Sequence, residues 1–233
     1  MRWIFVVVVF CLLSTGAAVA NDCRTSAAQA QRTLEQIKQQ WPLRSIRDPI
    51  VVYVQALGQR LSQVVPLDES PRFWVVRNLE PMGFALGGGQ FMISDGLLAL
   101  VRDEAQLAAV LAHELAHQQL NHFCIRRSHH TARIPLGSVV QHFDLNLEIE
   151  ADQHAAAVLG LAGFDPRAMS TVLQCLAERE PSSTHLKIRI GELERGSNPR
   201  PTSPPVHSLD FLNAQHQVHE DLRRLGADIA GCR

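Results

Sequence analysis

The 233-residue sequence has little of several features that mark common functional classes. Aromatic residues make up only 6% and the formal net charge is −1, so neither the basic patch nor the stacking platform of a nucleic-acid-binding protein is expected. No two cysteines stand in CxxC spacing, which leaves thiolate zinc sites and dithiol redox chemistry without support. By contrast, 46% hydrophobic and 19% charged residues exclude a disordered chain and suffice for one good-sized core.

Long apolar runs are also scarce, and the clearest one stands at the N-terminus. Arg2 precedes an apolar run from Trp3 to Leu13, and Ala18-Val19-Ala20 forms a small-x-small cleavage signal. The run is too short to span a hydrocarbon core of about 30 Å. We therefore predict a signal peptide over residues 1–20 and an exported chain that starts at Asn21, with the periplasm favoured over secretion. The alternative is an uncleaved membrane anchor, which N-terminal sequencing of the mature protein distinguishes.

Four cysteines remain after residue 20, and an even number in an oxidising compartment predicts two disulfides. Three pairings are open. Because chain termini often lie close together, Cys23–Cys232 with Cys124–Cys175 is slightly favoured. Buried free thiols are the alternative.

The pattern along the mature chain predicts a mostly helical domain with one small sheet. Asp48 and Pro49 suit the cap and first position of a helix, and Asp103 with Gln106 suits a capping box. Strands are predicted over residues 73–76, 84–86 and 91–93. Helices are predicted over about residues 24–41, 49–64, 103–123, 144–161, 167–179, 184–195 and 206–225. A proline-rich linker covers residues 199–205, and no internal repeat or second independent domain is evident.

The predicted helix 103–123 contains His113-Glu114-Leu115-Ala116-His117, an HExxH motif. Two histidines four residues apart lie on one face of a helix, so both imidazoles can reach one metal ion. Glu114 is rotated by about 100° from His113 and can reach a metal-bound water, which is where a general base belongs. The motif lies inside an apolar helix, which argues against two merely solvated histidines.

Catalytic zinc sites use three protein ligands, so a third ligand is needed from elsewhere. Glu148 and Asp152 are four residues apart on the next long helix and share a face. One of them can bind the metal while the other accepts the free N–H of a ligating histidine. Glu150 faces roughly the opposite side and is read as a solvated charge. The other histidines, including His122 and His154, are not expected to bind metal.

Several linked segments resemble the M48-type zinc metallopeptidases of the gluzincin group, over about residues 48–195. The resemblance rests on the glycine-rich strand pair, the approach to HExxH, an ExxAD motif and the exit from that second helix. The segments are Gly83-Phe84-Ala85-Leu86-Gly87-Gly88-Gly89, Ile93-Ser94-Asp95-Gly96-Leu97-Leu98, residues 103–110, Glu148–Asp152 and residues 162–168. HExxH alone is moderately specific, and this ordered set is strong.

The resemblance implies an α+β, mostly helical, zincin-like peptidase domain with a three-stranded sheet packed on the HExxH helix. Together with the signal-like start and the proline-rich linker, it predicts a signal peptide over residues 1–20, a peptidase domain over 21–198, and a linker with the last helix over 199–233. His113, His117 and Glu148 would bind one Zn²⁺ per chain, with Glu114 as catalytic base and Asp152 as partner of a ligating histidine. His185 is a candidate for approaching the metal or stabilising the oxyanion. Substrate would add as a strand along Phe84, Ala85, Leu86, Gly87 and Gly88.

The sequence thus predicts a zinc metalloendopeptidase of the cell envelope that acts on unfolded or misassembled polypeptides. Nucleic acid is not an expected partner, and peripheral association with a membrane or an envelope protein is compatible with this reading. The alternative is a non-proteolytic, zinc-binding, chaperone-like envelope factor. Chelator-sensitive peptide cleavage that zinc restores distinguishes the two.

Overall fold

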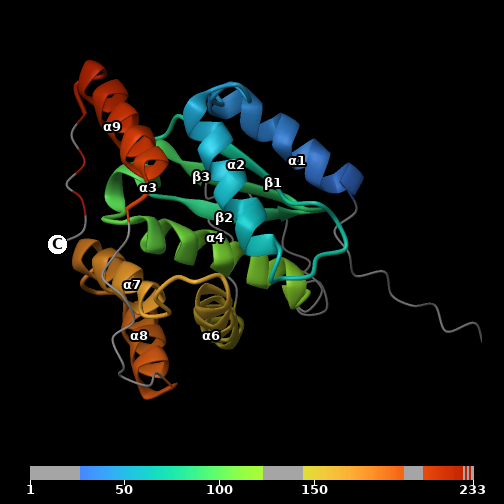
Figure 1. Ribbon diagram of the computed structural model, residues 1–233, viewed down its shortest axis with the longest axis vertical. Coiled ribbons are helices and arrows are strands. Elements are labelled where there is room, and N and C mark those ends of the chain that lie inside the picture. Colours follow the sequence, from blue (N-terminus) through green and yellow to red (C-terminus); the bar gives the residue numbers. More distant parts are fainter. Residues whose placement is uncertain (1–26, 123–143, 197–206, 228, 230, 232–233) are drawn as a thin grey trace, which may run out of the picture.

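A computed structural model describes residues 27–122, 144–196, 207–227, 229 and 231 of the chain. The described part is mostly helical with one small sheet, as predicted (Figure 1). The signal-like segment, the proline-rich linker, Cys23, Cys124, Cys232 and the histidines at 129 and 130 lie outside the described residues. The elements are α1 (Ala27–Gln40), α2 (Pro49–Ser62), β1 (Arg72–Val76), β2 (Gly83–Gly87), β3 (Gln90–Ser94), α3 (Asp95–Leu100), α4 (Glu104–Gln119), α6 (Leu145–Leu161), α7 (Ala168–Arg179), α8 (Thr184–Gly196) and α9 (Leu209–Arg224).

The three predicted strands form a mixed sheet in the order β1-β3-β2. β1 pairs in parallel with β3, and β2 pairs antiparallel with β3. Phe73 and Phe91 lie opposite each other in this register, and their rings stack with centroids 5.0 Å apart. β2 is an outer strand of the sheet, and no strand of the described ranges pairs with its second edge.

Alternation of side chains along the strands divides the core between the two faces of the sheet. Trp74, Phe84 and Met92 belong to the cluster that contains the buried face of α1. Phe73, Ala85, Phe91 and Ile93 belong to the larger cluster that contains α2 and α4. Gly58 on α2 is needed for this packing, because a Cβ there would lie 2.0 Å from the Phe73 ring. The sheet is therefore covered by helices on both faces.

The short helix α3 follows β3 directly and was not among the predicted elements. Ser94 is its N-cap, and the Ser94 hydroxyl accepts from the backbone N–H groups of Leu97 and Met82 while donating to the Glu80 carbonyl. One buried hydroxyl thus satisfies three backbone groups. This network fixes the chain leading into β2 against the end of β3.

The HExxH helix α4 starts where the sequence predicts. The Asp103 carboxylate accepts from the Gln106 backbone N–H at 2.8 Å, and the Gln106 side chain accepts from the Arg102 backbone N–H at 2.7 Å. Between Leu107 and His117, α4 is buried on almost every side, so it is a central helix rather than an amphipathic surface helix. The HExxH motif therefore lies in the interior.

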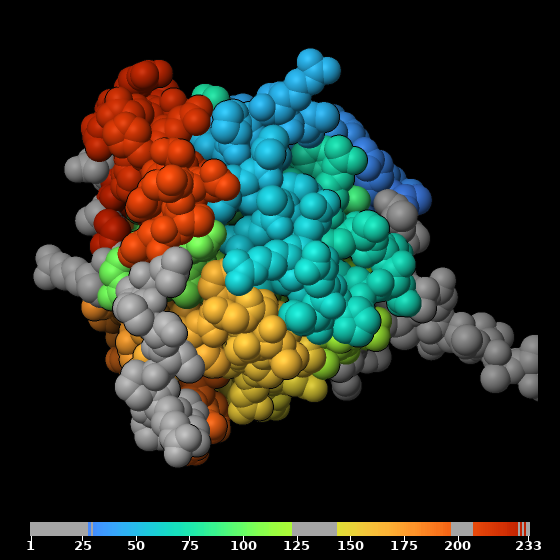
Figure 2. Space-filling model, viewed as in Figure 1, coloured from blue at the N-terminus to red at the C-terminus, as the bar shows by residue number. Residues whose placement is uncertain are grey.

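The final helix α9 joins the same core. Its buried side chains pack with α2 and α3, and the space-filling view shows α9 and α2 next to each other (Figure 2). Ser208, the N-cap of α9, donates its hydroxyl to Glu104 at 2.8 Å. Near the other end, Asp221 lies 2.9 Å from the buried guanidinium of Arg44, which also forms a two-bond pair with Asp95. Polar pairs thus attach both ends of α9 to distant parts of the chain.

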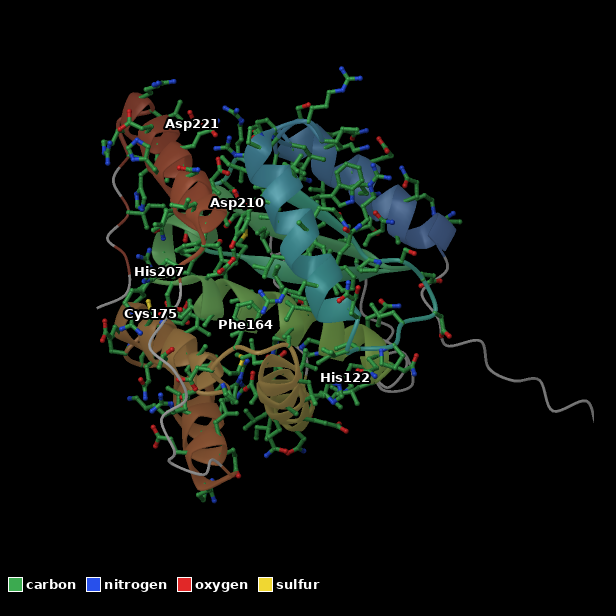
Figure 3. All side chains as sticks on the ribbon, in the orientation of Figure 1. His122, Phe164, Cys175, His207, Asp210 and Asp221 are labelled. Carbon is green, nitrogen blue, oxygen red and sulfur yellow. The ribbon has the colours of Figure 1, made fainter. Side chains whose placement is uncertain are left out.

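The predicted export and disulfides concern the hydrophobic segments and the cysteines of the chain. No helix among the described ranges combines the length and the hydrophobicity needed to cross a membrane. Cys175 is buried on α7 (Figure 3), and because the other mature-chain cysteines are not described, their pairing stays a prediction.

Candidate metal centre and active site

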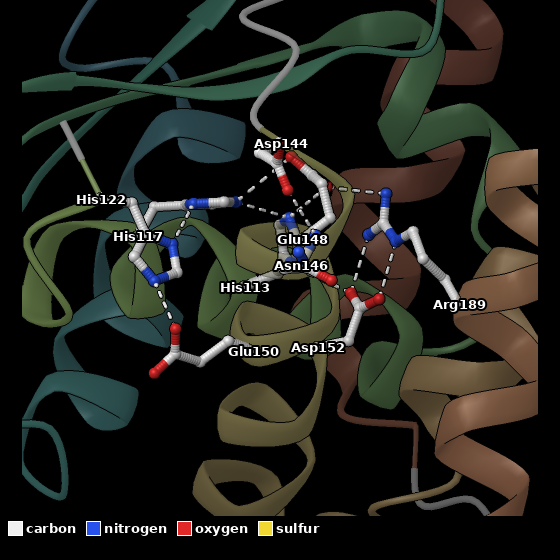
Figure 4. A network of polar contacts seen from close by, with 9 residues as sticks. All are labelled: His113, His117, His122, Asp144, Asn146, Glu148, Glu150, Asp152 and Arg189. Atoms are coloured by element: carbon white, nitrogen blue, oxygen red, sulfur yellow. Dashed lines mark hydrogen bonds and ion pairs between the residues drawn. The ribbon is translucent and has the colours of Figure 1, made fainter. Parts of the chain in front are cut away.

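The predicted site residues come together where α4 packs against α6. α4 carries the HExxH motif and α6 carries Glu148 and Asp152, with Asp144 as the α6 N-cap. The close-up shows both histidines and both carboxylates directed into one cluster, joined from a third helix by Arg189 of α8 (Figure 4).

Three potential ligand atoms converge at the centre of this cluster. The Nε2 atoms of His113 and His117 lie 3.0 Å apart. The Glu148 carboxylate oxygens lie 3.5 Å from the first and 3.7 Å from the second. Tetrahedral zinc with ligand distances near 2.1 Å requires donor atoms about 3.4 Å apart. The observed separations of the donor set therefore fit a tetrahedral ion with a fourth position open.

His113 is held from behind by a buried carboxylate. Its Nδ1 lies 2.9 Å from Asp152 Oδ1, and the Asp152 side chain is only 1% exposed. Burial lowers the pKa of His113, but the neighbouring Asp152 and Glu148 carboxylates outweigh burial and raise it to about 10. A metal ion at Nε2 would displace the proton there, because metal binding releases ligand protons. The Asp152 contact fixes the ring with Nε2 directed at the centre.

Arg189 connects the two acidic residues of α6. Its guanidinium forms two 2.7 Å hydrogen bonds to the Asp152 carboxylate, and its Nη1 lies 2.7 Å from Glu148 Oε2. Burial raises the carboxylate pKa values, but the nearby cations outweigh it: His113 and Arg189 lower the pKa of Glu148 to about 2, and Arg189 and His113 lower that of Asp152. Both groups are thus ionised, the form in which a carboxylate binds metal.

No role for Arg189 was predicted from the sequence. A signal for it exists in the pattern of α8, where Leu186, Ile190 and Leu193 pack on the core and Arg189 occurs at the same helical spacing. An arginine on an apolar helix face needs a buried acidic partner, and the two carboxylates of α6 supply one.

His117 has a different neighbour. Its Nδ1 lies 2.9 Å from His122 Nδ1, and His122 Nε2 lies 3.3 Å from Glu150 Oε2. His122 is fully buried, close to the end of α4 (Figure 3), whereas the Glu150 side chain is 57% exposed. Burial, with His113 nearby, lowers the pKa of His117 to about 2, so the ring is neutral and able to bind metal.

Glu150 is exposed, as predicted, but it also contacts His122. His154 contacts Gln119 instead of the centre.

Glu114 lies beneath β2, in position to serve as a base. Its carboxylate accepts a hydrogen bond from the backbone N–H of Ala85, and Glu114 Oε1 would be 3.5 Å from a Cβ placed on Gly83. The same Cβ would come within 2.9 Å of Val110, so glycine at position 83 permits the close approach of β2 to α4. Burial raises the pKa of Glu114 to about 7, which suits proton transfer near neutral pH.

The predicted substrate residues occupy β2 and the turn after it. Phe84 pairs with Met92 and Ala85 with Phe91, while Gly87 and Gly88 have positive φ in the turn toward β3. His185 is exposed in the first turn of α8, and the side chain of α8 that reaches the cluster is that of Arg189. The role considered for His185 stays a prediction.

The chain is similar in sequence to several known proteins. Residues 52–143 match the family model described as Peptidase family M48. A beta-barrel assembly-enhancing protease of Yersinia pestis is 27% identical over 257 residues, covering 92% of this chain and 51% of the relative. The mitochondrial metalloendopeptidase OMA1 of Schizosaccharomyces pombe is 30% identical over 207 residues, covering 73% of this chain and 61% of the relative. A beta-barrel assembly-enhancing protease of Escherichia coli K12 is 28% identical over 166 residues, covering 58% of this chain and 34% of the relative. The chain thus spans about half the length of the first of these relatives.

Proposed function

Because the chain belongs to peptidase family M48, we propose that it is a zinc-dependent endopeptidase that hydrolyses peptide bonds in extended polypeptides. The observation that carries the proposal is the convergence of His113, His117 and Glu148 beside a buried Glu114. Two imidazoles and one carboxylate are a donor set used by catalytic zinc, which is why zinc is preferred over harder metals.

His113, His117 and Glu148 would hold the ion. A zinc ion bound there supplies Lewis acidity, which polarises the scissile carbonyl and lowers the pKa of a bound water toward about 7. Asp152 holds the ring of His113 in orientation, and Arg189 holds the ionised Glu148 carboxylate. The site is largely buried, which strengthens its electrostatic interactions relative to bulk water.

Glu114 acts as general base and then as general acid. Its carboxylate accepts a proton from the attacking water and donates it to the leaving amine nitrogen. A pKa near 7 allows both transfers, since the group is neither too weak a base nor too weak an acid. The Ala85 N–H holds the carboxylate in place during these steps.

The position of β2 supports an extended polypeptide as the substrate. β2 ends the sheet on one side and passes directly over Glu114. A peptide that pairs with this strand edge would lie across the catalytic helix with its main chain in reach of Glu114. Main-chain pairing selects for extended, unfolded segments, and we propose unfolded or misassembled polypeptides as the substrate class.

We extend the proposal to the location of the protein. Export to the cell envelope is supported by the signal-like pattern of residues 1–20 and by the even number of cysteines that follow it. Two of the bacterial relatives bear the name beta-barrel assembly-enhancing protease, so envelope polypeptides are the proposed targets. Cell fractionation with N-terminal sequencing of the mature chain tests this part.

The decisive test uses Glu114→Gln. This variant should lose casein hydrolysis by at least about a thousandfold while it still binds zinc, because the amide cannot accept the proton. Glu178→Gln removes an exposed carboxylate from α7 and serves as the control. Hydrolysis by the wild type should stop with a chelator and return with zinc. Retained hydrolysis by Glu114→Gln contradicts the assignment, and a wild type that binds zinc without cleaving any polypeptide favours the chaperone-like alternative.

A further inference from the structure

A chain of three side chains runs from the metal centre to the molecular surface on the side of His117. His117 Nδ1 and His122 Nδ1 lie 2.9 Å apart, and His122 Nε2 lies 3.3 Å from Glu150 Oε2. His122 is fully buried between the two, and Glu150 reaches solvent. The close-up shows the three groups following one another away from the centre (Figure 4). The inference drawn from these three side chains rests on the proposed metal centre.

The metal site at one end of this hydrogen-bonded row and the Glu150 carboxylate at the other determine which ring nitrogen carries the hydrogen in His117 and in His122. If His117 uses Nε2 for the metal, its Nδ1 carries the hydrogen and donates to His122 Nδ1. His122 then carries its own hydrogen on Nε2, and this hydrogen points to a Glu150 carboxylate oxygen, which can only accept. The reverse order would leave a protonated Nε2 on His117 and would block metal binding. A single arrangement of tautomers is therefore compatible with a loaded site.

The backbone explains how His122 reaches His117. In an uninterrupted helix, a residue five positions later would lie about 140° away around the axis. α4 ends instead at Gln119, and Asn121 takes the left-handed conformation with φ of 56°. Asparagine tolerates this conformation better than most residues. The turn at Asn121 brings the ring of His122 back against His117.

We propose that His122 is a positioning residue that sets the tautomer and ring orientation of the metal ligand His117, with Glu150 anchoring His122 from the surface. A ligating histidine needs an acceptor for its second nitrogen, and for His113 that acceptor is Asp152. For His117 the acceptor is another imidazole. His122 acts through His117 and does not touch the reacting atoms.

The test compares His122→Leu, which has no acceptor, with His122→Asn, whose carbonyl oxygen can stand in for Nδ1. Zinc dissociation constants are measured by competition with a chromophoric chelator. His122→Leu should bind zinc 10- to 100-fold more weakly than the wild type, the range typical for the loss of such a partner, and His122→Asn should recover most of that loss. His154→Asn is the matched control, because His154 contacts α4 through Gln119 and not through a metal ligand. It should leave zinc affinity unchanged.

A role of His122 in packing alone would not distinguish leucine from asparagine in this way. Equal zinc affinity of His122→Leu and the wild type, or equal losses in the two variants, overturns the proposal. A wild type that binds no zinc overturns the metal centre itself, which is a separate result.

A second measurement does not depend on the folding of any variant. Ring ¹⁵N chemical shifts of the zinc-loaded wild type should identify His122 as the tautomer with its hydrogen on Nε2. A hydrogen on Nδ1 of His122 contradicts the proposed direction of the hydrogen bonds from His117 through His122 to Glu150. Glu150→Gln should weaken zinc binding by less than about threefold, because its carboxylate is exposed and its hydrogen bond is screened by water.

Discussion

The two imidazoles of the candidate metal centre, His113 and His117, have different surroundings. Behind His113, Asp152 is 1% exposed and is paired through two hydrogen bonds with Arg189, so charge sits in the interior and links α4, α6 and α8. Behind His117, the neutral His122 leads to Glu150, whose side chain is 57% exposed. Buried charges are costly to leave unpaired, whereas an exposed carboxylate is solvated whether or not it is paired. We therefore expect substitutions behind His113 to lower stability and zinc affinity strongly, and substitutions behind His117 to change them less.

The largest effect should come from Asp152→Asn. The amide cannot balance Arg189 or accept from His113 as a carboxylate does, so a buried guanidinium loses part of its pairing. We expect about 3 kcal/mol lower stability in urea unfolding and about 100-fold weaker zinc binding. Asp165→Asn is the matched control, since Asp165 forms an exposed pair with Arg167 and should cost under about 1 kcal/mol. Similar losses in the two variants would remove the distinction between buried and exposed pairs.

A smaller effect is expected from Arg189→Lys. Lysine keeps the charge but cannot form the two parallel bonds to Asp152 together with the contact to Glu148. Zinc affinity should fall by about tenfold. Arg195→Lys, on an exposed part of the same helix, should leave affinity unchanged. An Arg189→Lys variant with wild-type affinity would show that positive charge alone suffices.

The smallest effect should come from the turn that places His122. Asn121→Ala forces an alanine into a left-handed conformation, which costs about 1 kcal/mol and disturbs the approach of His122 to His117. Asn121→Gly accepts the same conformation and should stay near the wild type. Thermal unfolding and zinc competition measure both. If alanine and glycine behave alike, the conformation of residue 121 has no part in the site.

Much of the site could be predicted from the sequence because its spacing is helical. HExxH and the Glu148–Asp152 pair each place two side chains on one helix face, and the structure brings these faces together. The three strands and the caps at Asp48 and Asp103 follow from local chemistry and are confirmed.

Unlike Asp152, the supporting residues Arg189 and His122 could not be placed at the site from the spacing within the HExxH and Glu148–Asp152 helices. Arg189 reaches the centre from a helix 37 residues beyond Asp152, so its role depends on tertiary packing. His122 depends on a break in helical periodicity at Asn121, and a count of residues around a continuous helix points it elsewhere. α3 is too short to show a helical period, and its start depends on Ser94, whose network involves residues of the segment before β2.

The attachment of α9 has a consequence for biosynthesis. Glu104, at the start of the HExxH helix α4, accepts hydrogen bonds from Tyr53 and from Ser208 at the α9 N-cap, and Phe211 packs in the same core as α2. A ribosome delivers α4 about a hundred residues before α9, so a nascent chain that already contains the HExxH motif still lacks one wall of its interior. The interior around the HExxH motif is therefore complete only after α9 has been synthesised and has packed against α2.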